Sequence, residues 1–311
     1  MPNTLTIILA THVLYISGSV SAAASIDHDP SHNAFRVRSG EQLPGFKYIY
    51  LEEDGHVSST FNHSIVQLEI AGSPLCSELA LRVAADDLIK MTQHMPRHIF
   101  ENVASKSTVG IFSAQEKIIV FPEYAHFANG DCGSSCLGPC SHTCSSDGRK
   151  YETIAGLGGK RAAILEDNVL CTSRDPYYHY LSVLVHEFTH TIHAYGLEPA
   201  TRHNITVAYH HALQSHIWAT GSYAMSNERE YLAVATTVFF GVNRNGSQNS
   251  GGMNTCGGAL CHTEQDGRRH LREKDPMLFD ILSYVFTDNN ADVTSQLTTC
   301  PAVGFDPSIV G

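Results

Sequence analysis

The sequence predicts an α+β fold in which a small mixed sheet with helices comes first and a mainly helical half follows. Strand-like and helix-like segments alternate along the first half, helical patterns dominate the second half, and nine cysteines are available for cross-links. The chain has 311 residues, 42% of them hydrophobic, which is enough for one substantial core. We therefore expect one disulfide-stabilised domain over residues 25–311.

Residues 1–24 have the pattern of a signal peptide. A polar start precedes an interrupted apolar run, and small residues follow from Ser21 to Ser25. Cleavage is expected near Ala22 to Ala24, with an uncleaved N-terminal anchor as the alternative because the start lacks Lys and Arg. No later segment is apolar enough to cross a membrane. The sequence thus predicts a secreted, extracellular protein without membrane contact after cleavage.

The first elements of the mature chain are read from periodicity. FKYIYLEEDG (46–55) and FNHSIVQLEIAG (61–72) are expected to be strands, with a turn at Asp54 and Gly55. SELALRVAADDLIKMTQHM (77–95) has apolar residues at helical spacing and opens on Ser77, a plausible cap. Residues 107–124 supply one or two further strands.

The cysteines indicate an oxidising compartment. Four of them recur every fourth residue within residues 130–150, here called the Cys-rich segment: Cys132, Cys136, Cys140 and Cys144. Glycines and a proline disfavour a helix there, so we expect a disulfide-pinned loop, with a zinc knuckle as the alternative. Cys256 and Cys261 are expected to form a local bridge. The odd count leaves one thiol free or in an intermolecular bond, and three cysteines have no partner that the sequence identifies: Cys76, Cys171 and Cys300.

The net charge bears on possible binding partners, and the sequons bear on glycosylation. The formal net charge of -11, without any basic run, excludes phosphate-backbone binding and hence nucleic acid as a partner. Three N-x-S/T sequons, at Asn62, Asn204 and Asn245, are glycosylation candidates that would mark surface positions. The sequence does not indicate an oligomeric state.

A helix carrying an H-E-x-x-H pattern is expected just after the middle of the chain, in VLVHEFTHTIHAYG (183–196). We expect it to begin with Asp175 as N-cap and Pro176 as its first residue, and to end at Gly196 in a left-handed conformation, with Leu197 as an apolar clasp. His186 and His190 then lie about 40° apart on one face of a helix otherwise fit for burial.

Two imidazoles and a carboxylate on such a helix are typical of a catalytic zinc site. His186 and His190 would be ligands, and Glu187, about 100° around from His186, would lie beside the metal as a general base. Core histidines satisfied by backbone groups are the structural alternative. His193 lies on the same face but about 10 Å from His186 by helix rise, so it is assigned to packing or to support of the ligands.

The third ligand is expected on a downstream helix in GSYAMSNEREYLAVATTVFFGVN (221–243). Ser226 or Asn227 can cap it, and a broad apolar surface follows. Glu228 and Glu230 lie about 200° apart around such a helix, so only one of them can face the metal. Helical geometry alone does not choose between them.

The string VLVHEFTHTIH followed by SYAMSNEREYLA resembles the active site of the gluzincin metallopeptidases related to anthrax lethal factor. This resemblance, limited to the catalytic core, implies a zincin-like fold whose lower helical subdomain carries the third ligand, one Zn²⁺ per chain, Glu230 as that ligand and Tyr223 as the donor that stabilises the oxyanion. One departure is Val234, where the family commonly has a second acidic residue that orients the ligands.

More broadly, the chain resembles a family of largely uncharacterised secreted HExxH proteins. The matching stretches are FPEY, EDNVLC, EYLAVATTVFFGVN and DPMLFDILSYVF, which together span roughly residues 60–290.

The sequence thus predicts a secreted zinc metallopeptidase that acts on peptides or proteins. Two alternatives remain open, because H-E-x-x-H specifies an activated water and not a substrate. One is a zinc amidohydrolase acting on a non-peptide or cell-wall amide. The other is a noncatalytic secreted protein whose zinc site is structural or whose Cys-rich segment binds a partner.

Overall fold

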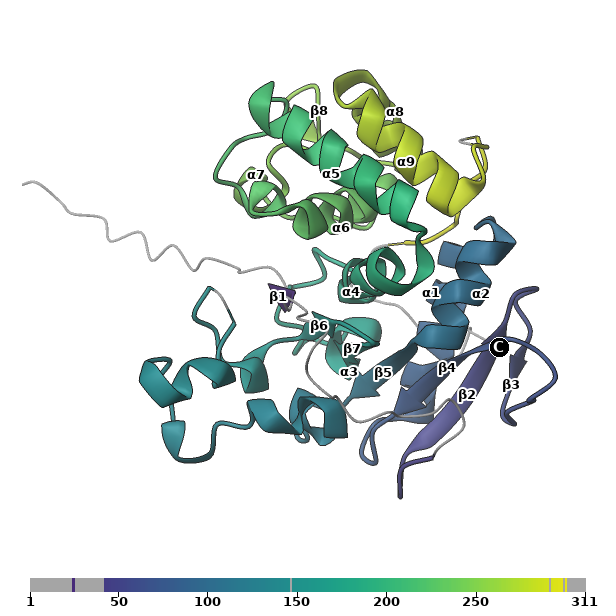
Figure 1. Ribbon diagram of the computed structural model, residues 1–311, viewed down its shortest axis with the longest axis vertical. Helices are drawn as coiled ribbons and strands as arrows, with labels where there is room; N and C mark the ends of the chain where they lie inside the picture. Colours follow the sequence, from purple (N-terminus) through teal and green to yellow (C-terminus); the bar gives the residue numbers. More distant parts are fainter. Residues whose placement is uncertain (1–23, 26–41, 146, 291, 299, 301–311) are drawn as a thin grey trace, which may run out of the picture.

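The computed structural model describes residues 24–25, 42–145, 147–290, 292–298 and 300 (Figure 1). The predicted signal peptide lies almost entirely outside these residues and stays a prediction. In the described part, strands and helices form a mixed α+β structure, and the fold class is confirmed at that level. Within that part, no helix has both the length and the apolar character needed to cross a membrane.

A seven-stranded mixed sheet forms the first half, in the order β1-β6-β7-β5-β4-β2-β3. The strands are β1 (Ala24–Ser25), β2 (Lys47–Glu52), β3 (Val57–Ser58), β4 (Gln67–Gly72), β5 (Thr108–Phe112), β6 (Gly156–Gly158) and β7 (Arg161–Leu165). The parallel neighbours β4, β5 and β7 are buried at every residue, as expected for strands covered on both faces. Strands β2 and β6 run antiparallel to their neighbours β4 and β7.

The predicted early elements are confirmed with small changes. The turn after β2 forms where expected, with the His56 N–H donating to the Asp54 carboxylate at 2.9 Å. Ser77 caps α1 (Glu78–Thr92) by accepting from the Ala80 N–H at 3.2 Å. Residues 107–124 give only one strand, β5, because the chain then continues in short 3-10 turns. Helices α1, α2 (Arg97–Lys106) and α3 (Glu166–Val169) pack beside the sheet.

The H-E-x-x-H helix, α4, begins at Val183, later than predicted, and continues to Thr191. Ser182 is its N-cap and accepts from the Val185 N–H at 3.3 Å. The predicted cap Asp175 instead closes a tight turn by accepting the N–H groups of Tyr177 and His179 at 3.1 and 2.8 Å. Because His179 has a φ of 66°, helical continuation from Asp175 is ruled out.

The end of α4 also differs from the prediction. A π-helical turn extends it over Ile192–Gly196, and Gly196 does not adopt a positive φ. The Leu197 N–H donates to the Ile192 carbonyl at 3.1 Å, and Leu197 is buried as expected of a clasp. The left-handed stop is therefore wrong, although the helix ends at the predicted residue.

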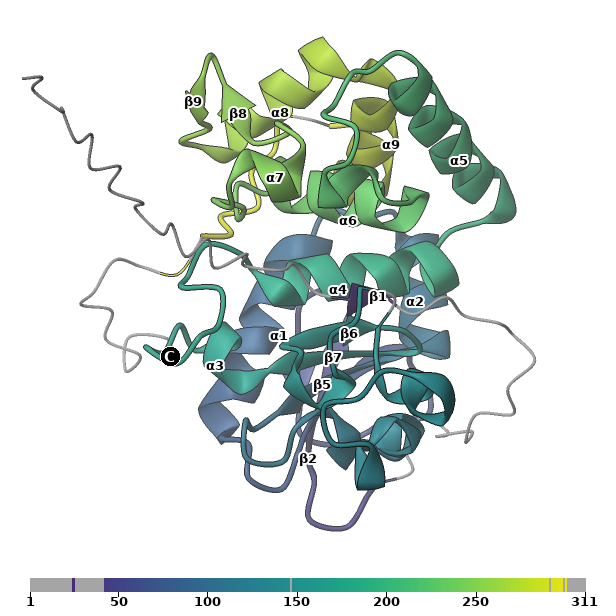
Figure 2. The same ribbon diagram turned by 90° about the vertical axis from the view of Figure 1, so that its left-hand side faces the viewer.

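The second half is helical and lies across α4 from the sheet (Figure 2). It comprises α5 (Pro199–Gln214), α6 (Glu228–Phe239), α7 (Ser247–Ser250), α8 (Glu264–Lys274) and α9 (Pro276–Thr287), with a small hairpin of β8 (Thr255–Cys256) and β9 (Ala259–Leu260). The buried Asp275 joins three parts of it: its carboxylate accepts from Trp218 Nε1 at 2.9 Å, from the Tyr231 hydroxyl at 2.6 Å, and from the Leu278 N–H at the start of α9.

Four disulfides are present: Cys132–Cys140, Cys136–Cys144, Cys171–Cys300 and Cys256–Cys261. The disulfide-pinned loop and the local bridge are thus confirmed, and Cys76 is the buried free thiol. Of the sequons, Asn62 and Asn204 are exposed. Asn245 is only 4% exposed, because residues 243–254 fold back on it, so its predicted surface position is wrong.

Candidate metal centre

Helix α4 is buried at all nine residues between the sheet and α6. It lies this close to the sheet because β6 presents glycines on the side facing it. A Cβ on Gly156 would approach Glu187 Cγ at 2.7 Å, and one on Gly158 would approach His190 Cβ at 2.4 Å. Neither position can carry a side chain unless α4 moves, so the Gly-Leu-Gly strand fixes how near the sheet comes to the H-E-x-x-H turn.

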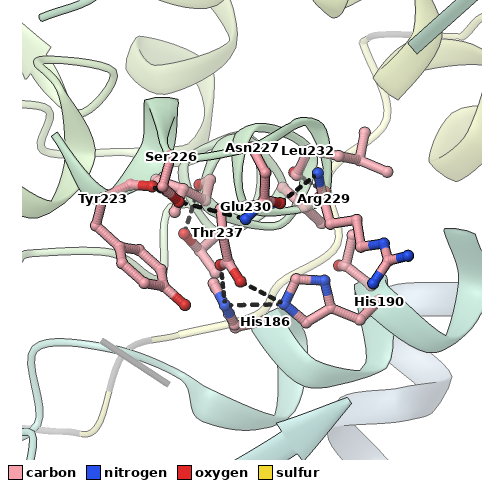
Figure 3. Close-up of polar contacts among 12 residues, drawn as sticks. His186, His190, Tyr223, Ser226, Asn227, Arg229, Glu230, Leu232 and Thr237 are labelled. Atoms are coloured by element: carbon pink, nitrogen blue, oxygen red, sulfur yellow. Dashed lines mark hydrogen bonds and ion pairs between the residues drawn. The ribbon is translucent and has the colours of Figure 1, made fainter. Parts of the chain in front are cut away.

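The structure brings His186, His190 and Glu230 together (Figure 3). The two Nε2 atoms are 3.2 Å apart. The Glu230 carboxylate lies 3.1 Å from His186 Nε2 through Oε2 and 3.5 Å from His190 Nε2 through Oε1. All three side chains are buried, so three ligand-type atoms converge on one point from two helices.

These spacings match a tetrahedral zinc site. Zinc bonds of about 2.0–2.1 Å to N and O donors place neighbouring ligands about 3.4 Å apart along a tetrahedral edge. The separation of the two Nε2 atoms, and the distance from each of them to its nearer Glu230 oxygen, fall around that value. Two neutral imidazoles and one carboxylate are also a donor set that zinc prefers when a fourth position is kept open. The residues present therefore fit a catalytic zinc ion.

Asn227 and the first turn of α6 determine which glutamate faces the histidines. The Asn227 side chain caps α6 by accepting the N–H groups of Arg229 and Glu230 at 3.0 and 3.1 Å. In this register Glu230 points inward and is 1% exposed, whereas Glu228 is partly exposed and acts electrostatically on His193 and Tyr209. The structure thus brings Glu230 rather than Glu228 to the histidines.

Glu187 is fully buried beside this group, and neither carboxylate oxygen has a hydrogen-bond partner of good geometry among the described residues. Burial raises its pKa well above the ordinary value, and the Glu230 charge adds to this, while the Gly158 backbone N–H and Arg149 lower it. A buried carboxylate with this bias accepts a proton readily, as a general base requires.

His190 and His193 differ in their position relative to this group. Burial lowers the pKa of His190 to about 3, which favours the neutral, ligating form of the ring. His193 is 6% exposed in the π-helical turn and stands outside the converging group, as predicted. Burial lowers its pKa to about 4. His193 is therefore a packed neutral residue in this structure.

Tyr223 lies on a short 3-10 turn just before α6, with its ring centroid 6.2 Å from that of His186. Its hydroxyl hydrogen-bonds with Glu230, and burial followed by the Glu230 charge raises its pKa well above the ordinary value. A protonated phenol beside the ligand group is able to donate to a developing oxyanion. Val234, at the departure from the family pattern, is buried and apolar and offers no polar support to the ligands.

A second group of ligand-type residues is formed by Asp175, His179 and Cys300. Cys300 is bonded to Cys171, so its sulfur is not available as a thiolate.

Sequence reasoning did not identify Gly156 and Gly158 as neighbours of the site. The two glycines gave a usable signal, because glycines two positions apart leave one face of a strand without side chains, and this often marks a close approach of another element.

Comparisons with known proteins add little to this geometry. No protein-family model matches the chain, and no curated protein matches it. Among solved structures, the chain is similar to a Pro-Pro endopeptidase from Paenibacillus alvei, with 15% sequence identity, coverage of 73% of this chain and 94% of that chain, and a TM-score of 0.41. A likeness this low carries no argument here.

Proposed function

We propose that the protein is a secreted zinc metallopeptidase of the gluzincin type with a zincin-like fold. The observation that carries this proposal is the convergence of His186 Nε2, His190 Nε2 and the Glu230 carboxylate, whose two oxygens lie 3.1 and 3.5 Å from the two rings, with the buried Glu187 beside them. Four disulfides support an oxidising compartment, in keeping with secretion.

Each residue then has a defined role. Zinc held by His186, His190 and Glu230 would polarise the scissile carbonyl and acidify the attacking water. Glu187 accepts a proton from that water as its oxygen bonds to the carbonyl carbon, and delivers the proton to the amine nitrogen when the C–N bond breaks. Tyr223 donates its hydroxyl hydrogen to the carbonyl oxygen as negative charge develops there.

The test exposes a complex peptide library to the purified secreted protein and to Glu187→Gln, with new termini identified by mass spectrometry. We expect cuts by the wild type only, with the rate falling by about 10²- to 10⁴-fold in Glu187→Gln while the zinc content stays the same. Glu273→Gln, an exposed carboxylate on α8, is the matched control and should cut like the wild type.

Retained turnover in a zinc-loaded Glu187→Gln protein would refute the role of Glu187 as base. Absence of cuts by a zinc-loaded wild type would overturn the peptidase assignment, and the same pair of proteins would then be tested on non-peptide amides.

A further inference from the structure

The loop that leads from α3 into α4 carries a second cluster of ligand-type side chains, separate from the metal centre. A carboxylate oxygen of Asp175, a ring nitrogen of His179 and the sulfur of Cys300 all lie within 4.8 Å of one another. Asp175 is buried, whereas His179 and Cys300 are partly exposed, so solvent reaches the cluster. In the oxidised chain the Cys300 sulfur is bonded to Cys171. The cluster is therefore a disulfide with an imidazole and a carboxylate beside it.

Hydrogen bonds hold His179 in the orientation of a metal ligand. Its ring Nε2 lies 2.8 Å from the Thr172 carbonyl, which can only accept, so Nε2 carries the proton and Nδ1 keeps the lone pair. Histidines that bind metals commonly donate their second ring nitrogen to a carbonyl in this way. The His179 N–H also donates to Asp175 Oδ2 at 2.8 Å. One tight turn thus fixes both the imidazole and the carboxylate.

This turn does not depend on the disulfide alone. Asn168 donates its side-chain amide to Asp175 Oδ1 at 3.0 Å, and both residues are buried. Three non-glycine residues around the cluster have positive φ values, namely Cys171 at 53°, Tyr178 at 51° and His179 at 66°. Such conformations are costly and persist only where the surrounding contacts determine them firmly. We therefore expect Asp175 and His179 to keep their places when the bridge is opened.

The separations within the cluster suit a zinc ion. Zinc bonds of about 2.3 Å to sulfur and about 2.0–2.1 Å to nitrogen or oxygen place neighbouring ligands about 3.4–3.6 Å apart in a tetrahedral site. Separations of up to 4.8 Å reach this geometry by adjustments of about 1 Å, which rotation of the side chains can supply. Thiolate, imidazole and carboxylate are all donors that zinc accepts.

We propose that Asp175, His179 and Cys300 bind a zinc ion when the Cys171–Cys300 bridge is open, with Cys171 as the fourth ligand. A dithiol reductant opens the bridge: its thiolate attacks one sulfur, the S–S bond breaks, the reductant leaves as its own disulfide, and two thiols remain on the chain. Zinc binding then releases both thiol protons to water. The ion replaces the bridge as the link between this loop and residue 300. The inference is independent of the proposed peptidase function.

The test opens the bridge by substitution and leaves the other disulfides intact. Cys171→Gly offers no ligand atom, and glycine adopts the φ of 53° without strain. We expect this variant to bind one zinc more per chain than Cys171→Gly/Cys300→Ser, as measured by elemental mass spectrometry after equilibration with a zinc buffer. With cobalt in place of zinc, a thiolate-to-cobalt charge-transfer band should appear only in Cys171→Gly, because the ligands of the metal centre include no sulfur.

Further variants test the cluster itself. In the Cys171→Gly background, His179→Ala should lose both the additional zinc and the cobalt band. His211→Ala, which removes an exposed histidine on α5, is the matched control and should keep both. Zinc should also raise the thermal midpoint of Cys171→Gly more than that of the double variant, because the ion ties residue 300 to the loop. If Cys171→Gly does not fold, Cys171→Ser takes its place.

Two results overturn the proposal. Cys171→Gly and the double variant could bind equal amounts of zinc. The cobalt band could instead survive His179→Ala, which would show that the Cys300 thiolate binds the ion without the cluster. Because the measurement is a difference between two variants, a metal centre that binds no zinc would overturn the proposed function and leave this inference standing.

Discussion

The metal centre and the Cys-rich segment are held in place by different forces. Every residue of α4 is buried, and α4 packs against both the sheet and α6. In the Cys-rich segment, by contrast, the only buried residues among those described are Thr143 and Ser145, and two disulfides cross-link the rest. Apolar packing therefore fixes His186 and His190 on α4, while covalent bonds fix the Cys-rich segment. Substitutions that disturb packing should therefore mainly affect the metal centre, and removal of a disulfide should mainly affect the Cys-rich segment.

The largest effect is expected from Phe188→Ala, within α4. Phe188 is fully buried, so its truncation leaves a cavity and should lower the free energy of unfolding by about 3–5 kcal/mol. Leu137→Ala is the control in the Cys-rich segment, where Leu137 is 82% exposed and the expected change is within about 0.5 kcal/mol. Urea unfolding measures both. Equal losses would show that the two regions do not differ as described.

Next in size is the double variant Cys136→Ser/Cys144→Ser. This disulfide closes a loop with a sequence separation of 8. By reducing the entropy of the unfolded segment, it stabilises the folded segment by about 2–3 kcal/mol. We expect faster trypsin cleavage after Arg149 and Lys150, and little change in the thermal midpoint of the rest. Timed proteolysis with mass spectrometry checks this. A large drop in the global midpoint would mean that the segment folds together with the core.

A smaller effect is expected at the cap of α6. Asn227→Ala removes the acceptor for the Arg229 and Glu230 N–H groups and should cost about 1 kcal/mol. Because Glu230 lies in that first turn, zinc affinity should fall as well, which titration with a competing chelator would measure. Ser226→Ala, one residue earlier, is the matched control. Unchanged zinc affinity in a destabilised Asn227→Ala protein would separate the cap from the ligand.

A pH dependence is also expected in α1, which packs against α4. Burial raises the pKa of Asp87 to about 7, so the folded protein binds its proton more tightly than the unfolded chain does. The stabilising contribution is present below about pH 4 and is lost as the pH rises through about 7. Asp87→Asn should therefore be more stable than the wild type at pH 8 and no more stable at pH 4, as thermal melts would measure. A gain of equal size at both pH values would contradict this.

The sequence predicted most of the fold because its signals are local. Ser77 and Asn227 cap helices where expected, and Cys256 pairs with Cys261 five residues away. Where the prediction was wrong, a competing local conformation decided the outcome. Asp175 had the right chemistry for a helix cap, but in the structure its carboxylate closes a turn that is incompatible with a helix.

The candidate site, too, was predictable only where its signals are local. The four-residue spacing of His186 and His190 was readable, yet the choice of Glu230 over Glu228 depends on the register that Asn227 imposes on α6. The roles of His186, His190 and Glu230 as zinc ligands stay predictions. The close approach of β6 to α4 depends on the folding of distant segments, and the two glycines of β6 were its local sign.

The Cys171–Cys300 bridge also has a consequence for biosynthesis. Its two halves are 129 positions apart, and Cys171 lies a short distance before α4. Oxidation at this position has to wait until residue 300 has been translated, long after α4 itself. The segment leading into α4 therefore acquires this cross-link only after the helical half has been made, and a nascent chain that stops short of residue 300 cannot acquire it.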